Sequence, residues 1–217
     1  MSWETILFDL DGTLTDPAEG ITKAVEVALN HYGITVEDRS TLNKFIGPPL
    51  DESFPEFYGF NDEQVREATR VFREYFGRQG WAENIPYPGI DKLLRDLKAA
   101  GKKLIIATSK PEEFAVRIMN HFGLAQYMDV IAGASTDNQE GAKKANVIRK
   151  ALQRAGVEDL SSVVMVGDRR HDVAGGHEVG MKVIGVLYGY GDRAEHEAAG
   201  ADYIVEDIPS LEKLLLG

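Results

Sequence analysis

Four short segments of the chain are almost uniformly apolar and end abruptly in polar residues. They cover residues 5–8, 103–109, 162–168 and 182–187. A strand of a parallel sheet is covered on both faces, so it shows a continuous apolar run instead of an alternation of apolar and polar positions. The pattern therefore predicts buried parallel strands whose polar residues gather at the carboxyl ends. Two shorter apolar stretches, residues 130–131 and 203–205, are expected to add strands.

Between these segments the apolar residues recur with helical spacing. Helices are predicted over residues 90–100, 111–122, 142–155 and 172–179. Each is followed by a glycine in the place of a left-handed residue that ends a helix: Gly101, Gly123, Gly156 and Gly180. The alternation of strand and helix from residue 85 onward predicts an α/β, Rossmann-like doubly wound parallel sheet. Ligands of such sheets bind outside the carboxyl ends of the strands.

Residues 16–84 break this alternation and have helical patterns throughout. The segments 21–32 and 62–76 both carry apolar residues at helical spacing. Turn-forming clusters, Asp-Pro at residues 16–17 and Pro-Tyr-Pro-Gly at residues 86–89, mark the two edges. The sequence therefore predicts a core domain of residues 1–15 and 85–217, with a helical domain of residues 16–84 inserted after the first strand.

Charge and composition narrow the kinds of partner that we expect. The 217 residues include 24 basic and 35 acidic ones, and the net charge of −11 opposes binding to a nucleic acid polymer or an anionic membrane. The chain has no cysteine, which excludes disulfides and thiolate metal sites. No apolar run is long enough to span a membrane and no secretory signal is recognisable, so a cytoplasmic location is expected. The oligomeric state stays open between monomer and homodimer.

The polar strand ends carry the groups that a phosphoryl-transfer site needs. These are carboxylates, hydroxyls and a lysine: Asp9, Asp11, Thr108, Ser109, Asp168, Asp172, and Lys143 or Lys144. Carboxylates that meet in one crevice repel each other by about 4 kcal/mol per pair at the effective dielectric of a protein edge. A divalent cation removes this repulsion, and a ligand set made of oxygens favours Mg²⁺. The sequence therefore predicts that the four aspartates form a Mg²⁺ site.

These segments resemble the four motifs of the haloacid dehalogenase-like (HAD) phosphohydrolases. DLDGTL at residues 9–14 is similar to the first motif, and IIATS at residues 105–109 to the second. Lys144 or Lys143 corresponds to the third, and VMVGD at residues 164–168, with Asp172, to the fourth. The resemblance covers essentially the whole chain, and the inserted helical domain corresponds to the cap of the family. It implies a Mg²⁺-dependent phosphatase of a small phosphorylated metabolite, most similar to phosphoglycolate phosphatase.

The resemblance also implies the catalytic and metal-binding roles. Asp9 would attack phosphorus and carry an aspartyl-phosphate. Asp11 would donate a proton to the leaving oxygen and then activate water. Mg²⁺ would bind Asp9, the carbonyl of Asp11 and Asp168. Asp172 would be either a direct ligand or a residue that orients one.

Phosphate binding is implied for a second group of residues. Thr108, Ser109 and the backbone N–H groups around Asp11 and Gly12 would hold phosphate oxygens. The lysine would neutralise charge in the transition state. Lys144 fits the third motif better than Lys143, which stays the alternative.

Other functions remain open on the sequence. The enzyme could be a 5′-nucleotidase, or transfer the phosphoryl group to a sugar as β-phosphoglucomutase does. A phosphonoacetaldehyde hydrolase-like enzyme would use Lys23 or Lys44 of the cap as a Schiff base. A receiver-type signalling module also combines acids, a threonine and a lysine on a doubly wound sheet. The length, the helical insertion and the position of Asp11 all oppose a receiver module.

Two glycine-containing segments are expected to border the site. FIGPPL at residues 45–50 resembles the cap loop that influences specificity in the family. The segment GYG at residues 189–191 follows a late strand and lacks the third glycine of the dinucleotide-binding fingerprint. We interpret it as a loop beside the active site.

Overall fold

The computed structural model describes residues 3–135, 141 and 143–217. The chain divides into two compact units, one formed by Met1–Thr15 with Pro86–Gly217 and the other by Asp16–Ile85. It passes from one to the other at β2 (Thr15–Asp16) and β3 (Ile85–Pro86), which pair with each other. That the smaller unit acts as a substrate cap stays a prediction. Among the described residues, no helix has the length and apolar character needed to cross a membrane.

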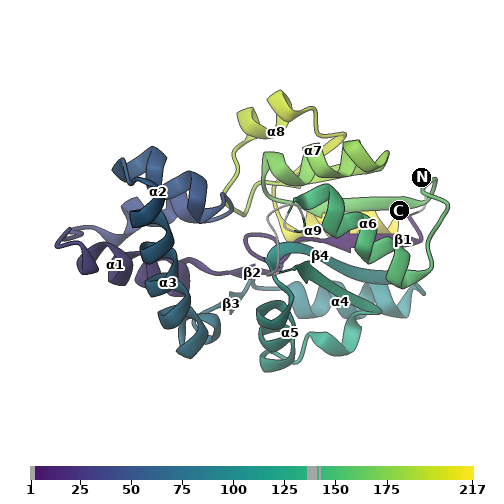
Figure 1. Cartoon of the computed structure of the whole chain (residues 1–217). Coiled ribbons are helices and arrows are strands. Elements are labelled where there is room, and N and C mark those ends of the chain that lie inside the picture. The colour runs from purple at the N-terminus through teal and green to yellow at the C-terminus, as the bar shows by residue number, and fades with distance from the viewer. Residues whose placement is uncertain (1–2, 136–140, 142) are drawn as a thin grey trace. The chain divides into compact units, whose positions relative to one another are not determined.

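The larger unit is built on a six-stranded sheet (Figure 1). Its strands are β1 (Thr5–Phe8), β4 (Lys103–Pro111), β5 (Val130–Ala134), β6 (Val163–Gly167), β7 (Lys182–Val186) and β8 (Tyr203–Val205). The order is β5-β4-β1-β6-β7-β8 and all neighbours are parallel. Because β1 lies inside the sheet and later strands are added on both sides of it, the sheet is doubly wound. The predicted fold class is confirmed.

Helices connect the strands of this unit. They are α4 (Ile90–Ala99), α5 (Glu112–His121), α6 (Lys144–Ala155), α7 (Arg170–Val179), α8 (Arg193–Ala199) and α9 (Ile208–Leu216), with a 3-10 turn η3 (Ala125–Tyr127). The four glycines expected to follow helices have positive φ angles of 78°, 68°, 64° and 90°. The predicted start of α6 at residue 142 lies outside the described residues, and the helix begins at Lys144.

Both faces of the sheet are buried, as the uniform apolar runs predict. Leu7 of β1 packs in a cluster that includes Val147 of α6 and Val173 of α7. Its neighbours Ile6 and Phe8 are also fully buried, and alternate residues of a strand point to opposite faces. Figure 1 shows α6 and α7 on one side of the sheet and α4 on the other. The cover on both faces leaves the ends of the strands as the place for polar chemistry.

The smaller unit is helical. Its elements are α1 (Ala18–His31), the 3-10 helix η1 (Arg39–Phe45), α2 (Leu50–Tyr58), α3 (Asp62–Arg78) and the 3-10 turn η2 (Gly80–Ala82). Asn61 begins α3 with a capping box, in which its side chain accepts from Gln64 N at 3.0 Å. Phe45 and Phe54 pack with ring centroids 5.1 Å apart and are buried. The segment 45–50 therefore contributes its first side chain to the core of this unit.

Candidate active site

The register of the sheet aligns the ends of three strands. Phe8, the last residue of β1, pairs with Ile106 of β4 and with Val166 of β6. Asp9 therefore leaves β1 at the level of the next residues of those two strands. As a result, the polar residues that follow β1, β4 and β6 meet at the same edge of the sheet.

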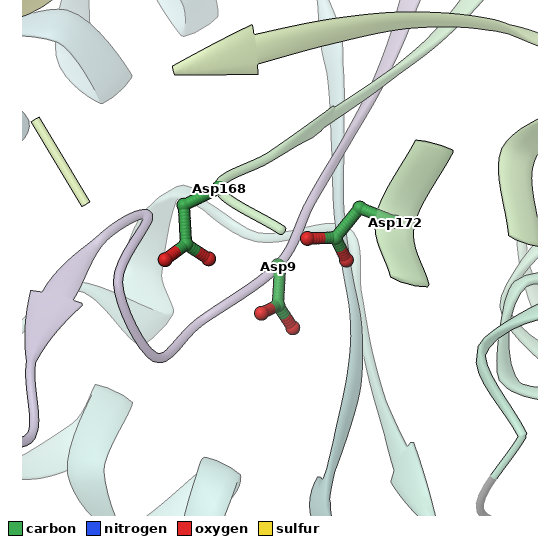
Figure 2. Close-up of side chains that lie close together, drawn as sticks. All are labelled: Asp9, Asp168 and Asp172. Carbon is green, nitrogen blue, oxygen red and sulfur yellow. The ribbon is translucent and has the colours of Figure 1, made fainter. Parts of the chain in front are cut away.

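Three aspartates form a compact cluster at this edge. One carboxylate oxygen each of Asp9, Asp168 and Asp172 lies within 4.8 Å of the others. Figure 2 shows the three side chains close together, with Asp9 on the segment after β1 and Asp172 on α7. Asp168 is 1% exposed and Asp172 is 2% exposed. The structure thus brings together three of the four aspartates that the sequence predicts as a metal site.

Two glycines make room for these carboxylates. A Cβ atom on Gly167 would overlap the carboxylate of Asp172, and a Cβ atom on Gly12 would overlap that of Asp168. Gly12 also has a φ of 84°, in the left-handed region that favours glycine. Asp172 Oδ2 accepts from Arg169 N at 3.1 Å, which fixes its position at the start of α7. Glycine is therefore needed where the backbone approaches the acids most closely.

Lys144 is the cation that joins the cluster. Its Nζ atom lies 2.7 Å from Asp9 Oδ1 and 2.7 Å from Asp172 Oδ1, and it donates to Ala107 O at 3.1 Å. Burial lowers the pKa of Lys144, but Asp172 and Asp9 raise it by more, so the net pKa lies above the ordinary value. Lys144 is therefore held as an ammonium ion between the two carboxylates.

Lys144 and Lys143 differ in burial because α6 begins at Lys144. Lys144 is the first residue of α6 and its side chain is 6% exposed, whereas Lys143 is exposed. The stem of Lys144 lies against Gly175 of α7, where a Cβ atom would come within 2.6 Å of Lys144 Cγ. The structure thus brings Lys144 to the aspartates, which is the assignment that the family motif favours.

Burial shifts Asp168 and Asp172 toward their protonated forms. It raises the pKa of Asp168 well above the usual range, and the charges of Asp172 and Asp9 add to the effect. Burial also raises the pKa of Asp172, which Lys144 partly opposes. The site therefore has more negative charge than its own lysine can stabilise.

A divalent cation fits this arrangement. Asp168 Oδ1 is buried and has no hydrogen-bond partner among the residues that the structure describes. Together with Asp9 and Asp172 it offers only oxygen atoms, which suits a hard cation such as Mg²⁺. The donor set and the unsatisfied charge both fit the cation that the sequence predicts.

Asp11 lies outside the three-acid cluster and has its own lysine. Its Oδ2 accepts from Lys110 Nζ at 2.6 Å. Burial raises the pKa of Asp11, and Lys110 opposes this shift without cancelling it. The raised pKa favours the protonated form of the Asp11 carboxyl, and its role as a proton donor stays a prediction. The metal contact implied for the Asp11 carbonyl stays a prediction.

Lys110 is a residue of the site that the sequence pattern did not predict. Residues 108–110 continue β4, and the pairing of β4 with β5 shifts register between Thr108 and Pro111. Thr108 and Lys110 are buried, and Ser109 between them is exposed. The hydrogen bond from Lys110 N to Thr108 Oγ1 places these two buried residues side by side. Phosphate binding by Ser109 stays a prediction.

Two predicted phosphate-binding groups already have partners. Thr108 Oγ1 accepts from Lys110 N at 3.2 Å, which leaves its own O–H to donate. Gly12 N donates to Thr15 O at 2.7 Å, so this N–H would have to leave that bond to reach a phosphate oxygen. Thr108 is thus the better placed of the two.

The cap lysines have surroundings of their own in the smaller unit. Lys23 Nζ lies 2.7 Å from Glu19 Oε1 and 2.9 Å from Glu83 Oε1, and hydrogen bonds to both raise its pKa. Lys44 Nζ lies 4.5 Å from the centre of the Phe57 ring. A lysine that forms a Schiff base needs a lowered pKa. The environment of Lys23 opposes that use.

Comparison with known proteins identifies a family and several relatives that cover most of the chain. The haloacid dehalogenase-like hydrolase family matches residues 6–186. A 5′-nucleotidase from Pseudomonas aeruginosa is 40% identical over 215 residues, which is 99% of this chain and 96% of that protein. The tyrosine-protein kinase PtkA of Mycobacterium tuberculosis is 41% identical over 212 residues, 97% of this chain and 71% of the kinase. A phosphoglycolate phosphatase from Aquifex aeolicus is 32% identical over 185 residues, 85% of each chain.

A solved structure extends the likeness to the whole chain. The crystal structure of a predicted phosphatase from Clostridium acetobutylicum superimposes with a TM-score of 0.93 and 46% identity. The match covers 100% of this chain and 99% of that one. The likeness therefore includes the inserted helical unit as well as the sheet.

Proposed function

Because the chain belongs to the haloacid dehalogenase-like hydrolases and is a phosphatase of that family, we propose that it hydrolyses a small phosphate monoester through an aspartyl-phosphate on Asp9. The observation that carries the proposal is the largely buried cluster of Asp9, Asp168 and Asp172 with Lys144 at the carboxyl edge of the sheet. It combines a nucleophile, a cation site and a fixed positive charge in one place.

Mg²⁺ is the proposed cofactor. When bound, it supplies positive charge that offsets the charge of the phosphoryl oxygens. Asp9 and Asp168 would hold it, and Asp172 would either bind it directly or orient its other ligands. The raised pKa values of Asp168 and Asp172 support this, because both carboxylates gain stability from a nearby cation.

In the first step the Asp9 carboxylate attacks phosphorus. Lys144 holds Oδ1 of this carboxylate, so the other oxygen forms the new bond to phosphorus. The bond from phosphorus to the leaving oxygen breaks, and Asp11 donates its proton to that oxygen. The raised pKa of Asp11 favours the protonated form that this step requires.

In the second step water releases the phosphoryl group. Asp11, now a carboxylate beside Lys110, accepts a proton from the water as the water oxygen bonds to phosphorus. The bond between Asp9 and phosphorus breaks, and inorganic phosphate leaves. Lys144 stabilises negative charge in both steps because it stays protonated beside Asp9.

For the substrate, we propose nucleoside 5′-monophosphates first and 2-phosphoglycolate second. The 5′-nucleotidase relative has the higher identity and covers more of the chain than the phosphoglycolate phosphatase relative. A sugar phosphate mutase reaction uses the same aspartyl-phosphate and would appear as transfer to a sugar. A phosphonoacetaldehyde hydrolase is not favoured, because Lys23 is held as a paired ammonium ion.

A second candidate is phosphoryl transfer to a protein tyrosine. The 41% identity to the kinase PtkA over 97% of the chain favours testing it. The same aspartyl-phosphate would then pass to a phenol oxygen instead of water. Phosphotyrosine formed from ATP on a peptide would support this candidate, and its absence during active phosphate release would exclude it.

The experiment is a phosphate-release assay of the purified protein. The substrates are p-nitrophenyl phosphate, nucleoside 5′-monophosphates, 2-phosphoglycolate, pyrophosphate, sugar phosphates and phosphonoacetaldehyde. We expect release in Mg²⁺ that EDTA abolishes and renewed Mg²⁺ restores. Asp9→Asn protein prepared in parallel controls for contaminating phosphatases. Release that continues in EDTA would contradict the proposal.

A further inference from the structure

The segment 188–191 follows β7 and has no role in the reaction described above. Gly167 at the end of β6 pairs with Gly185 of β7, so the chain beyond β7 runs beside the chain beyond β6. Asp168 is the first residue after β6. The segment, which contains the GYG sequence, therefore lies next to a proposed metal ligand.

One backbone group of this segment bonds directly to Asp168. Tyr190 N donates to Asp168 Oδ2 at 2.8 Å. The other oxygen, Oδ1, is the buried atom that has no hydrogen-bond partner in the described part of the chain. The two oxygens of Asp168 are thus distinguished: the loop holds one, and the other is available to a cation.

Both glycines of the segment are needed for this close approach. A Cβ atom on Gly189 would overlap Gly12 O and Asp168 Cβ, and a Cβ atom on Gly191 would overlap Asp168 O. Neither glycine has a positive φ, so space and not backbone conformation requires glycine here. Any side chain at residue 189 would displace Asp168 or the loop.

Tyr188 at the start of the segment and Glu195 after its end also contact residues near Asp9 and Asp168 in the sequence. Tyr188 Oη donates to Thr13 O at 3.1 Å, and its ring packs edge-on against Tyr87. On the other flank, Glu195 Oε1 accepts from Arg169 Nε at 2.9 Å and from Arg170 N at 2.7 Å. Both arginines directly follow Asp168. Contacts of Tyr188 and Glu195 therefore hold the chain on both sides of the bond from Tyr190 N to Asp168 Oδ2.

We propose that residues 188–195 are a positioning device for the metal site: Tyr190 N binds Asp168 Oδ2 and so presents Oδ1 to Mg²⁺, while Tyr188 and Glu195 hold the chain around this bond. The inference rests on the proposed function, because it assumes that Asp168 binds Mg²⁺. The residues that orient metal ligands typically contribute about 10- to 100-fold to metal affinity. The device is expected to act on Mg²⁺ affinity and much less on substrate affinity.

The first test is Gly189→Ala, measured by calorimetric titration with Mg²⁺ in the absence of substrate. We expect affinity to fall at least about tenfold. In turnover assays the half-activating Mg²⁺ concentration should rise by a similar factor, while excess Mg²⁺ restores kcat and leaves KM for substrate near the wild-type value. A purely structural loss would lower the active fraction without moving the half-activating concentration.

Gly20→Ala is the matched control. A Cβ atom on Gly20 would overlap Gly80 O in the smaller unit, so this variant has a comparable backbone clash away from Asp168. It should lower the melting temperature in EDTA and leave Mg²⁺ affinity unchanged. An equal loss of Mg²⁺ affinity in both variants would overturn the proposal.

Glu195→Ala decides the question if Gly189→Ala does not fold. It removes the contacts to Arg169 and Arg170 without adding atoms, and we expect a loss of Mg²⁺ affinity of several-fold. Wild-type Mg²⁺ affinity in folded Glu195→Ala and in any folded Gly189→Ala would overturn the proposal. If the wild-type protein itself binds no Mg²⁺, the proposed function fails at its cofactor, a result distinct from a failure confined to the variants.

Discussion

Each compact unit contains a lysine that lies between two carboxylates. Lys144 of the larger unit lies 2.7 Å from an oxygen of Asp9 and 2.7 Å from one of Asp172. Lys23 of the smaller unit lies 2.7 Å and 2.9 Å from two glutamates. The distances are nearly the same, so a list of ion pairs would treat the two lysines alike.

The two lysines differ in burial, and the pKa values of their partner acids shift in opposite directions. The side chain of Lys144 is 6% exposed, and burial raises the pKa of its partner Asp172. The side chain of Lys23 is 29% exposed, and its hydrogen bond lowers the pKa of its partner Glu19. The comparison shows that burial, more than distance, decides whether such a group stores unfavourable charge that a cation or a substrate can relieve.

The largest effect is expected for Lys144→Met. The buried Asp172 and the partly buried Asp9 lose their cation, so we expect a loss of about 3 kcal/mol in the free energy of unfolding in EDTA. Turnover in Mg²⁺ should fall by about 10²- to 10³-fold, since a fixed charge beside the nucleophile is removed. Denaturant unfolding and steady-state kinetics measure the two effects.

Lys143→Met is the control for that variant. Lys143 precedes Lys144 and is exposed, so we expect a change in stability within about 0.5 kcal/mol and turnover close to the wild type. Equal losses in the two variants would show that the lysine pair acts through general charge and not through the placement of Lys144.

The next largest loss of stability is expected for Gly12→Ala, for which Gly33→Ala is the control. Gly12 and Gly33 have φ angles of 84° and 73°, and a Cβ atom on Gly33 would meet nothing within 4 Å. Gly33→Ala should therefore cost only the left-handed strain of about 1–2 kcal/mol. Gly12→Ala should cost more, because its Cβ atom would also overlap the Asp168 carboxylate. Equal costs in thermal unfolding would mean that Asp168 moves aside freely.

The stability that Mg²⁺ adds to the protein is expected to depend on pH. Without Mg²⁺, the folded protein has raised pKa values at Asp168 and Asp172, so it binds protons more readily than the unfolded chain. The stability from these groups is complete below their ordinary pKa and is lost as the pH rises through the raised values.

Mg²⁺ should therefore stabilise the protein more at pH 8 than at pH 5. We expect the difference in unfolding free energy between Mg²⁺ and EDTA to grow by about 1 kcal/mol or more. Glu19 has the opposite sign, since its lowered pKa makes its stability fall with falling pH. It contributes equally with and without Mg²⁺, so it cancels from the difference. A difference that shrinks with rising pH would contradict this account of the buried acids.

The smallest effect is expected for Lys23→Met. Its ion pairs are partly exposed to solvent, so we expect less than about 1 kcal/mol in unfolding free energy, decreasing further at high salt. A loss as large as that of Lys144→Met would show that Lys23 and Lys144 contribute equally to stability, in spite of their different burial. Chemical denaturation at low and high salt separates the two cases.

Much of the fold and the centre of the site were predictable from the sequence. The run at residues 5–8 is strand β1 with the same bounds, because a strand buried on both faces leaves little ambiguity in its pattern. Asp9, Asp168 and Asp172 meet as expected, since parallel strands bring their carboxyl ends to one edge. The choice between Lys143 and Lys144 depended on the first residue of α6, which hydrophobic periodicity does not define to one position.

The remainder depended on contacts that no local pattern encodes. Lys110 was not predicted because β4 continues beyond its apolar run, with a register shift between Thr108 and Pro111 that the sequence pattern does not reveal. The N–H of Gly12 was expected to bind phosphate, and in the structure it donates to Thr15 O, while the missing side chain leaves space for Asp168. The bond from Tyr190 N to Asp168 joins residues far apart in the chain and follows from the pairing of β6 with β7.

The most direct test of the proposed mechanism is to identify the residue that carries the phosphoryl group during turnover. Protein quenched in acid while it hydrolyses substrate should carry one phosphoryl group on the peptide that contains Asp9, as measured by mass spectrometry. In Asp9→Asn the group should be absent and turnover should fall by at least about 10³-fold. A phosphoryl group on another residue, or turnover retained in Asp9→Asn, would contradict the account.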